Sequence, residues 1–209
     1  MSTERPTATG KRRYEQRRRA EQQAQTRQRI VDAAVELHGT LGPARSTVSA
    51  IAERAGVRRA TVYRYFPDER SLFLACSGHW ASLHPFPDPA SWTAVEDPAA
   101  RAAQALDALY GFFEGAQDML TVVIRDASVH PIVAELAVRR VAYLKSVVDS
   151  LARGWGARGR RAAAVRGALA LAVNFATWQT LNARGLRRDE AAALMCGAVR
   201  AAASGCADR

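Results

Sequence analysis

A short segment in the N-terminal third of the chain gathers side chains that can bind a polyanion. Residues 58–65 have the sequence Arg-Arg-Ala-Thr-Val-Tyr-Arg-Tyr. Guanidinium groups donate paired hydrogen bonds to phosphates and to guanine edges, and hydroxyl groups donate to phosphate oxygens. The residue types therefore predict contact with nucleic acid. The candidate contacts are Thr47, Arg58, Arg59, Thr61, Tyr63, Arg64 and Tyr65.

Two short helices and a tight turn are predicted to position these side chains. Ser46 or Thr47 suits the N-cap of the first helix, because a short hydroxyl side chain accepts hydrogen bonds from unpaired first-turn amides. Gly56 follows where the chain must turn, and glycine adopts the left-handed conformation there at the lowest steric cost. The apolar inner faces are formed by Val48, Ile51, Ala52 and Ala55 in the first helix, and by Val57, Val62 and Phe66 after the turn.

The second helix is basic at the end where basic residues are least favourable. Arg58 and Arg59 lie in its first turn, where the helix dipole disfavours a cation by about 0.3–1 kcal/mol each. Contact with a polyanion would explain them. A helix, a glycine turn and a basic second helix form the arrangement of a helix-turn-helix, whose second helix enters a DNA major groove. An ordinary helical hairpin with a solvated basic face is the alternative.

Residues 26–76 resemble the N-terminal domain of the TetR family of bacterial transcriptional regulators. The resemblance covers about a quarter of the chain. It rests on the amphipathic helix at 29–38, the Leu41-Gly42 turn, the helix-turn-helix, the aromatic exit Tyr63–Pro67, and Leu72 in the next helix. It implies that Thr47, Tyr63 and Tyr65 contact phosphates. It also implies that Arg58, Arg59, Thr61 and Arg64 lie in or near the groove.

Two residues depart from the family pattern. The chain has His38 where the family often has an aromatic residue, and we expect a histidine of the core or its boundary. It has Glu69 where the family commonly has a lysine that binds phosphate. Either Arg70 replaces that phosphate contact or the contact is absent.

The basic charge is concentrated near the N-terminus. The 209 residues carry a formal net charge of +10, which suits a polyanionic partner, although the arginine and alanine content indicates a compositional background as well. Residues 11–29 are basic and lack apolar periodicity, so we expect residues 1–25 to be a flexible arm that is disordered or nascently helical. A solvated tail is one interpretation. The other is an arm near phosphates or in a minor groove.

The remainder is predicted to be helical, which makes the chain all-α. We expect a three-helix DNA-binding domain over residues 26–70 and a helical effector-binding and dimerisation domain over residues 71–209. The segment 84–98 is interrupted by prolines and suits a connection. No strand pattern or internal repeat is evident. The expected helices span 70–83, 99–117, 119–128, 131–152, 160–183 and 188–203.

The last two predicted helices suggest a homodimer. The segment 160–183 is apolar on more than one face, so it must be buried on more than one side. The segment 188–203 carries a stripe rich in small residues, which permits close helix packing. Together they suit a four-helix dimer interface, which the family resemblance also implies. A monomeric core is the alternative.

The resemblance further implies a pocket for a small effector in the second domain. Asn174 is notable because it interrupts an apolar pattern, and a buried amide needs a partner. Ordinary core packing is the alternative for each candidate. The candidates for effector contact are Trp80, Phe112, Phe113, Arg125, Asn174 and Trp178.

Cysteine usage and the N-terminal sequence suggest a cytoplasmic protein. Cys76, Cys196 and Cys206 are odd in number and lack CxxC spacing, so neither a disulfide framework nor a metal site is expected. No signal peptide and no apolar run of membrane-spanning length is evident, so a membrane partner is not expected.

These features favour a ligand-responsive transcriptional regulator, most simply a repressor. It would bind a palindromic double-stranded DNA operator as a dimer and be released by an unknown small-molecule effector, without a cofactor. A DNA-binding protein without effector control, such as an activator or a nucleoid-type protein, is the alternative. An enzyme is disfavoured, because the sequence has no glycine-rich phosphate loop, paired carboxylates or nucleophile elbow.

Overall fold

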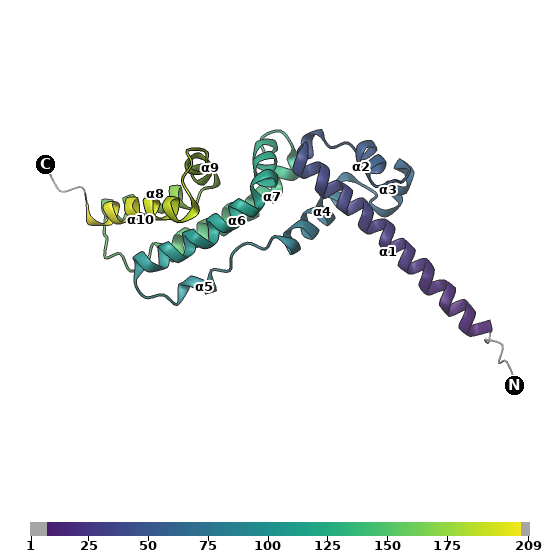
Figure 1. Ribbon diagram of the computed structural model, residues 1–209, viewed down its shortest axis with the longest axis horizontal. Coiled ribbons are helices and arrows are strands. Elements are labelled where there is room, and N and C mark those ends of the chain that lie inside the picture. Colours follow the sequence, from purple (N-terminus) through teal and green to yellow (C-terminus); the bar gives the residue numbers. More distant parts are fainter. Residues whose placement is uncertain (1–7, 206–209) are drawn as a thin grey trace. The chain divides into compact units, whose positions relative to one another are not determined.

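The computed structural model describes residues 8–205, and the secondary structure over that range is helical, without a strand (Figure 1). The all-α class is therefore confirmed. The chain divides into an N-terminal unit that ends at Trp80 and a C-terminal unit that begins at Ala81. This division lies ten residues beyond the boundary that the sequence suggested. In the described part of the chain, no helix is both long and apolar enough to cross a membrane.

The N-terminal unit packs a long helix against the two short ones. Its elements are α1 (Ala8–Thr40), the 3-10 turn η1 (Pro43–Arg45), α2 (Val48–Arg54), α3 (Arg59–Tyr65) and α4 (Glu69–Leu83), the last of which runs across the division. Helix α1 contacts α2, and α2 contacts α3. Buried apolar side chains from all four helices make one core, which includes Ile30, Val31, Ala34, Ile51, Val62, Phe66 and Leu72.

Helix α1 begins far earlier than the apolar pattern indicated. The pattern starts at residue 29, whereas the helix starts at Ala8. Residues 14–25 are almost all Gln, Arg, Glu and Ala, which favour helix, and extending a helix from its packed part costs little once the first turn exists. Of the two alternatives for the basic arm, residues 8–25 adopt the helical one. Residues 1–7 lie outside the described residues.

His38 lies in the core of the N-terminal unit, as expected. Its side chain is buried, and its Nδ1 lies 3.3 Å from the Sγ of Cys76 on α4. The imidazole ring also packs on Phe73, with the ring centres 5.1 Å apart. The histidine therefore joins α1 to α4 from within the core.

The C-terminal unit is built around one long helix. Helix α6 (Pro98–Asp126) is continuous across the break that was expected near residue 118, and it follows the short α5 (Ala90–Thr93). Asp97 caps it by accepting a hydrogen bond from the Ala100 amide over 2.7 Å, and Pro98 occupies its first turn. The other helices are α7 (Pro131–Leu151), α8 (Arg160–Ala172), α9 (Phe175–Ala183) and α10 (Arg188–Ser204). Helix α10 packs against both α8 and α6.

The single helix predicted over residues 160–183 is wrong, because two helices occupy that range. Helix α8 ends at Ala172, whose carbonyl accepts a hydrogen bond from the buried Tyr110 hydroxyl over 2.9 Å. Asn174 then caps α9, where its side chain accepts from the Ala176 amide over 2.8 Å. Asn174 is exposed, so the expected buried amide is also wrong. A residue that suits an N-cap favours a helix start over a helix interior.

Candidate nucleic-acid interface

The turn between α2 and α3 has the geometry that the sequence predicted. The Thr47 side chain accepts a hydrogen bond from the Ala50 amide over 3.1 Å, so Thr47 rather than Ser46 is the N-cap of α2. Gly56 has a φ of +65°, in the left-handed region. The amide of Val57 then donates to the Ala52 carbonyl over 2.9 Å and closes the turn. These bonds fix where α3 begins.

Helix α3 buries its apolar side and exposes its basic side. Val62 and Phe66 are 1% and 3% exposed, and they anchor α3 in the core. Tyr63 is 41% exposed. Arg58 occupies the N-cap position without a side-chain capping bond. Of the remaining candidates, Arg58, Arg59 and Arg64 are exposed, whereas Thr61 and Tyr65 are half-buried.

Two exposed arginines of α3 each lie against a tyrosine of the same helix. The Nη2 of Arg59 donates to the hydroxyl of Tyr63 over 3.1 Å, and its guanidinium lies 5.5 Å from the centre of the Tyr63 ring. The guanidinium of Arg64 lies 5.1 Å from the centre of the Tyr65 ring. Stacking on an aromatic face leaves guanidinium N–H groups available, so these arginines can still donate to an anion.

Arg54, which lies near α3 in the sequence, forms an ion pair between α2 and α1. The Nη2 of Arg54 on α2 lies 2.5 Å from the Oε2 of Glu36 on α1. A side-chain hydrogen bond from this arginine to Glu36 raises the pKa of Arg54. Both side chains are about half exposed, so the pair contributes little to stability. Its geometric consequence is that Arg54 belongs to the α1–α2 contact.

The chain after α3 leads directly into a capped helix. Asp68 precedes α4 and accepts a hydrogen bond from the Ser71 amide over 2.6 Å. That backbone bond, followed by the bond with the Ser71 side chain, lowers the pKa of Asp68. Glu69 and Arg70 are exposed in the first turn of α4. Replacement of the family's lysine contact by Arg70 stays a prediction.

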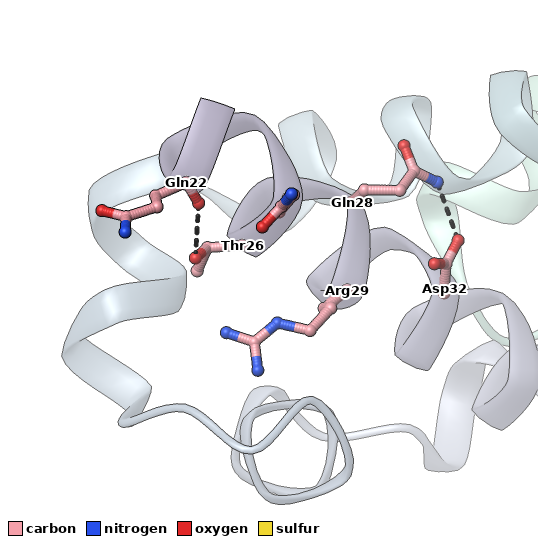
Figure 2. Close-up of a pocket in the computed structure, with 6 residues that line it drawn as sticks. Gln22, Thr26, Gln28, Arg29 and Asp32 are labelled. Carbon is pink, nitrogen blue, oxygen red and sulfur yellow. Dashed lines mark hydrogen bonds between the residues drawn. The ribbon is translucent and has the colours of Figure 1, made fainter. Parts of the chain in front are cut away.

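An open hollow lies along the middle of α1 (Figure 2). Figure 2 shows Arg29 pointing into it, while the Thr26 hydroxyl donates to the Gln22 carbonyl over 2.9 Å. The amide of Gln28 donates to the Asp32 carboxylate over 2.7 Å. This polar lining carries no apolar periodicity, so no sequence pattern predicted it. It is formed by Gln22, Gln25, Thr26, Gln28, Arg29 and Asp32.

The effector candidates fall into separate environments. Phe113 and Trp178 are buried, and their ring centres lie 5.8 Å apart. Phe112 is half-buried, and its ring centre lies 6.0 Å from that of Phe113. Trp80 is half-buried on α4 in the N-terminal unit. These observations place three of the candidates in one aromatic cluster.

The polar effector candidates have local partners. The Nε of Arg125 lies 2.7 Å from the buried Asp126 carboxylate, and this hydrogen bond raises the pKa of Arg125. Asn174 caps α9, as described above. Phe86 was not among the residues predicted from the sequence, although it packs on Phe112 and Tyr143 with ring centres 4.8 Å away in each case. Its position as an aromatic residue inside a proline-rich connection was the sequence feature that could have indicated this packing.

Comparison with known proteins agrees with this geometry. Residues 30–76 match the family model described as bacterial regulatory proteins, tetR family. Two regulators from Pseudomonas putida are each 38% identical over 85 residues, which is 38% of this chain. They are the HTH-type transcriptional regulator SrpR and the uncharacterized HTH-type transcriptional regulator TtgW. The match covers 40% of SrpR and 63% of TtgW, so it spans less than two thirds of either relative.

The fold of a larger part of the chain is also represented among solved structures. A TetR-like transcriptional regulator from Rhodococcus sp. RHA1 matches 86% of this chain and 96% of its own, with a TM-score of 0.60. The sequence identity is 20%, so this likeness concerns the fold alone.

Proposed function

We propose that this chain, a transcriptional regulator of the TetR family, binds a palindromic DNA operator as a homodimer and represses transcription until a small effector releases it. The observation that carries the proposal is the exposed basic face of α3 behind a capped, glycine-closed turn. Arg58, Arg59 and Arg64 supply contacts to bases or phosphates, while Thr61, Tyr63 and Tyr65 set the register on the DNA backbone. A cytoplasmic location is part of this proposal, because the proposed partner is operator DNA.

A dimer is supported by uncovered strips on α8 and α10. These helices pack side by side, and each buries part of its apolar surface inside the unit, through Val165 and Leu169 on α8 and Val199 on α10. The exposed remainder includes Leu171 and Leu194, which are 60% and 53% exposed. Small exposed residues at helical spacing accompany them, namely Ala164 and Gly167 on α8, and Gly197, Ala198 and Ala201 on α10.

Two-fold symmetry links this interface to the operator. A second copy packed on α8 and α10 would form a four-helix interface in which small residues let the helices approach closely. An isologous dimer carries two α3 helices related by a two-fold axis. Two such helices fit two half-sites about 34 Å apart on one side of the duplex.

Effector control is proposed for the aromatic cluster of the C-terminal unit. Phe112, Phe113 and Trp178 offer apolar contact for a small molecule. A ligand that binds one arrangement of the two units more tightly than the other would shift the spacing of the α3 helices. Such coupling is typically about 1–3 kcal/mol, which would lower operator affinity roughly 5–150-fold.

Selection of bound duplexes from a random pool tests the DNA claim, and light scattering at micromolar concentration tests the dimer. We expect enrichment of an inverted repeat and the mass of two chains. A ligand screen for release from the selected site then tests effector control. Specific binding that no small molecule releases would favour the alternative, a DNA-binding regulator without effector control. A monodisperse monomer would contradict the dimer.

A further inference from the structure

The N-terminal part of α1 is a highly charged helix whose described side chains, from residue 12 to residue 25, are exposed. Residues 12–29 contain seven arginines and two glutamates, so half of the chain's net charge of +10 lies in this short stretch. Residues 12–25 are exposed, and from residue 12 onward the first buried side chain of α1 is that of Ile30. Figure 1 shows this part of α1 extending away from α2 and α3. We call residues 12–27 the α1 extension.

One face of the α1 extension continues toward α3. At 100° per residue, an α-helix places Arg12, Gln16, Arg19, Gln23 and Arg27 within one narrow stripe. The guanidinium of Arg27 lies 5.0 Å from the centre of the Phe66 ring, and Phe66 directly follows α3. The stripe therefore lies on the side of α1 that meets the exit of α3.

The arginines at the far end of the stripe are available for a partner. Among residues whose side chains the structure describes, Arg12 and Arg19 have no ion-pair partner. By contrast, Arg17 pairs with Glu21 over 2.9 Å, and the Arg18 guanidinium lies 5.9 Å from the Tyr14 ring centre. The stripe consists of arginine and glutamine, both of which donate hydrogen bonds, and it offers no apolar surface. Its chemistry suits the repeating phosphates of a duplex and not the core of another protein.

We propose that the α1 extension is a second DNA-binding element, which binds as a helix to the phosphate backbone beyond the half-site contacted by α3. This rests on the proposed function. Fifteen steps along a helix at 1.5 Å per residue span about 23 Å. That length corresponds to about seven base pairs at 3.4 Å each. The extension therefore adds affinity outside the base-contacting region, without sequence preference.

The test compares full-length variants on a selected duplex with long flanks. The variant Arg12→Gln/Arg19→Gln removes two positive charges from the stripe. The control Arg139→Gln/Arg158→Gln removes two charges from exposed positions in the C-terminal unit. Hydroxyl-radical footprinting and the salt dependence of binding are measured for each. We expect the first variant to lose flank protection and to reduce the salt slope by about 0.9 for each phosphate that it no longer neutralises. The control retains both.

A proline variant tests whether the helix itself matters. Ala20→Pro keeps every arginine but interrupts the helix between Arg12 and the packed part of α1. Ala20 is exposed and lies ten residues before Ile30, so the core of the N-terminal unit is left intact. We expect this variant to lose flank protection as well, while protection of the half-site remains.

The outcomes separate this inference from the proposed function. Equal footprints and salt slopes for the wild type and Arg12→Gln/Arg19→Gln, with the half-site still bound, would overturn the α1 extension as a DNA-binding element and leave operator binding intact. Unchanged flank protection in Ala20→Pro would overturn its action as a helix. If the wild type binds no duplex, the proposed function fails first.

Discussion

Arg59 and Tyr63 are joined on the exposed face of α3 by a hydrogen bond of 3.1 Å from the arginine Nη2 to the tyrosine hydroxyl. The two residues are four apart, so the helix places one above the other. The Arg59 guanidinium also lies 5.5 Å from the Tyr63 ring centre, so the aromatic ring supports the cation. A guanidinium that is already held loses less side-chain freedom when it binds DNA.

Tyr63→Phe tests the hydroxyl of this pair. The variant keeps the ring under Arg59 but removes both the acceptor for Arg59 and the predicted phosphate contact. One hydrogen bond is worth about 0.5–1.5 kcal/mol, so we expect affinity to fall roughly 3–10-fold for operator and mismatched duplexes alike. Tyr63→Ala should weaken both further. Fluorescence anisotropy measures both affinities, and a loss confined to the operator would contradict the phosphate role.

The arginines at the start of α3 are expected to act differently from Tyr63. At least one of Arg58→Ala and Arg59→Ala should relax the preference at a single operator position by about 1–3 kcal/mol, because the alanine cannot donate the paired hydrogen bonds to a base edge. Arg139→Ala, an exposed change in the C-terminal unit, is the control. Competition against single-base operator variants measures the preference. Uniform weakening in both variants would assign these arginines to phosphates.

Two glycines of the N-terminal unit should respond to alanine with opposite sign. Gly56 has a φ of +65°, and although nothing lies within 4 Å of an added Cβ, the left-handed conformation costs a non-glycine residue about 1–2 kcal/mol. Gly78 lies inside α4 with equally open space, so alanine there should stabilise the unit by about 0.5–1 kcal/mol. Urea unfolding of both variants tests this difference in sign. Equal effects would contradict the turn geometry.

The cap of α9 can be separated from effector binding. Asn174→Ala removes the side chain that accepts from the Ala176 amide, so we expect a loss of about 1 kcal/mol in the free energy of unfolding. Asn174→Asp keeps the acceptor and should remain close to the wild type. Denaturant unfolding measures both. Wild-type stability in Asn174→Ala would argue against the capping role.

The Cys76 thiol makes stability depend on alkaline pH. Burial raises the pKa of this thiol from its ordinary value of 9.0 to about 12, so the folded state holds the proton more tightly than the unfolded state. The resulting stabilisation is full below about pH 9 and declines as the pH rises toward 12. Between pH 7.5 and 10.5, the wild type should lose up to about 2 kcal/mol more than Cys76→Ala. If the free energies of unfolding of the wild type and Cys76→Ala changed equally with pH, the result would contradict the burial of this thiol.

The helix-turn-helix was predictable because its signals are local. The Thr47 cap, the left-handed Gly56 and the inward Val62 and Phe66 each follow from a residue type at a fixed spacing, and the structure confirms all four. In this segment the apolar periodicity and the preferred residues of caps and turns predict the same helix boundaries. The same pattern places Arg58, Arg59, Thr61, Arg64 and Tyr65 on the outer side, and the structure exposes the three arginines but half-buries Thr61 and Tyr65.

The errors arose where periodicity and capping gave different answers. Apolar residues continue through Val173 and Phe175, so the periodicity suggested an unbroken helix, whereas Asn174 between them caps a new one. The extension of α1 to Ala8 carries no apolar period, so its helical propensity was the only signal. The contact between the Phe86 and Phe112 rings depends on tertiary packing, which a local sequence pattern does not predict.

The most direct test of the central claim is a hydroxyl-radical footprint of the full-length wild type and Tyr63→Ala on the duplex that selection yields. If α3 contacts DNA as proposed, the wild type protects two symmetric half-sites centred about 34 Å apart on one face of the duplex. Tyr63→Ala should then require higher protein concentrations for the same protection. Protection by the wild type that is absent or asymmetric, or a Tyr63→Ala footprint identical at every concentration, would contradict the claim.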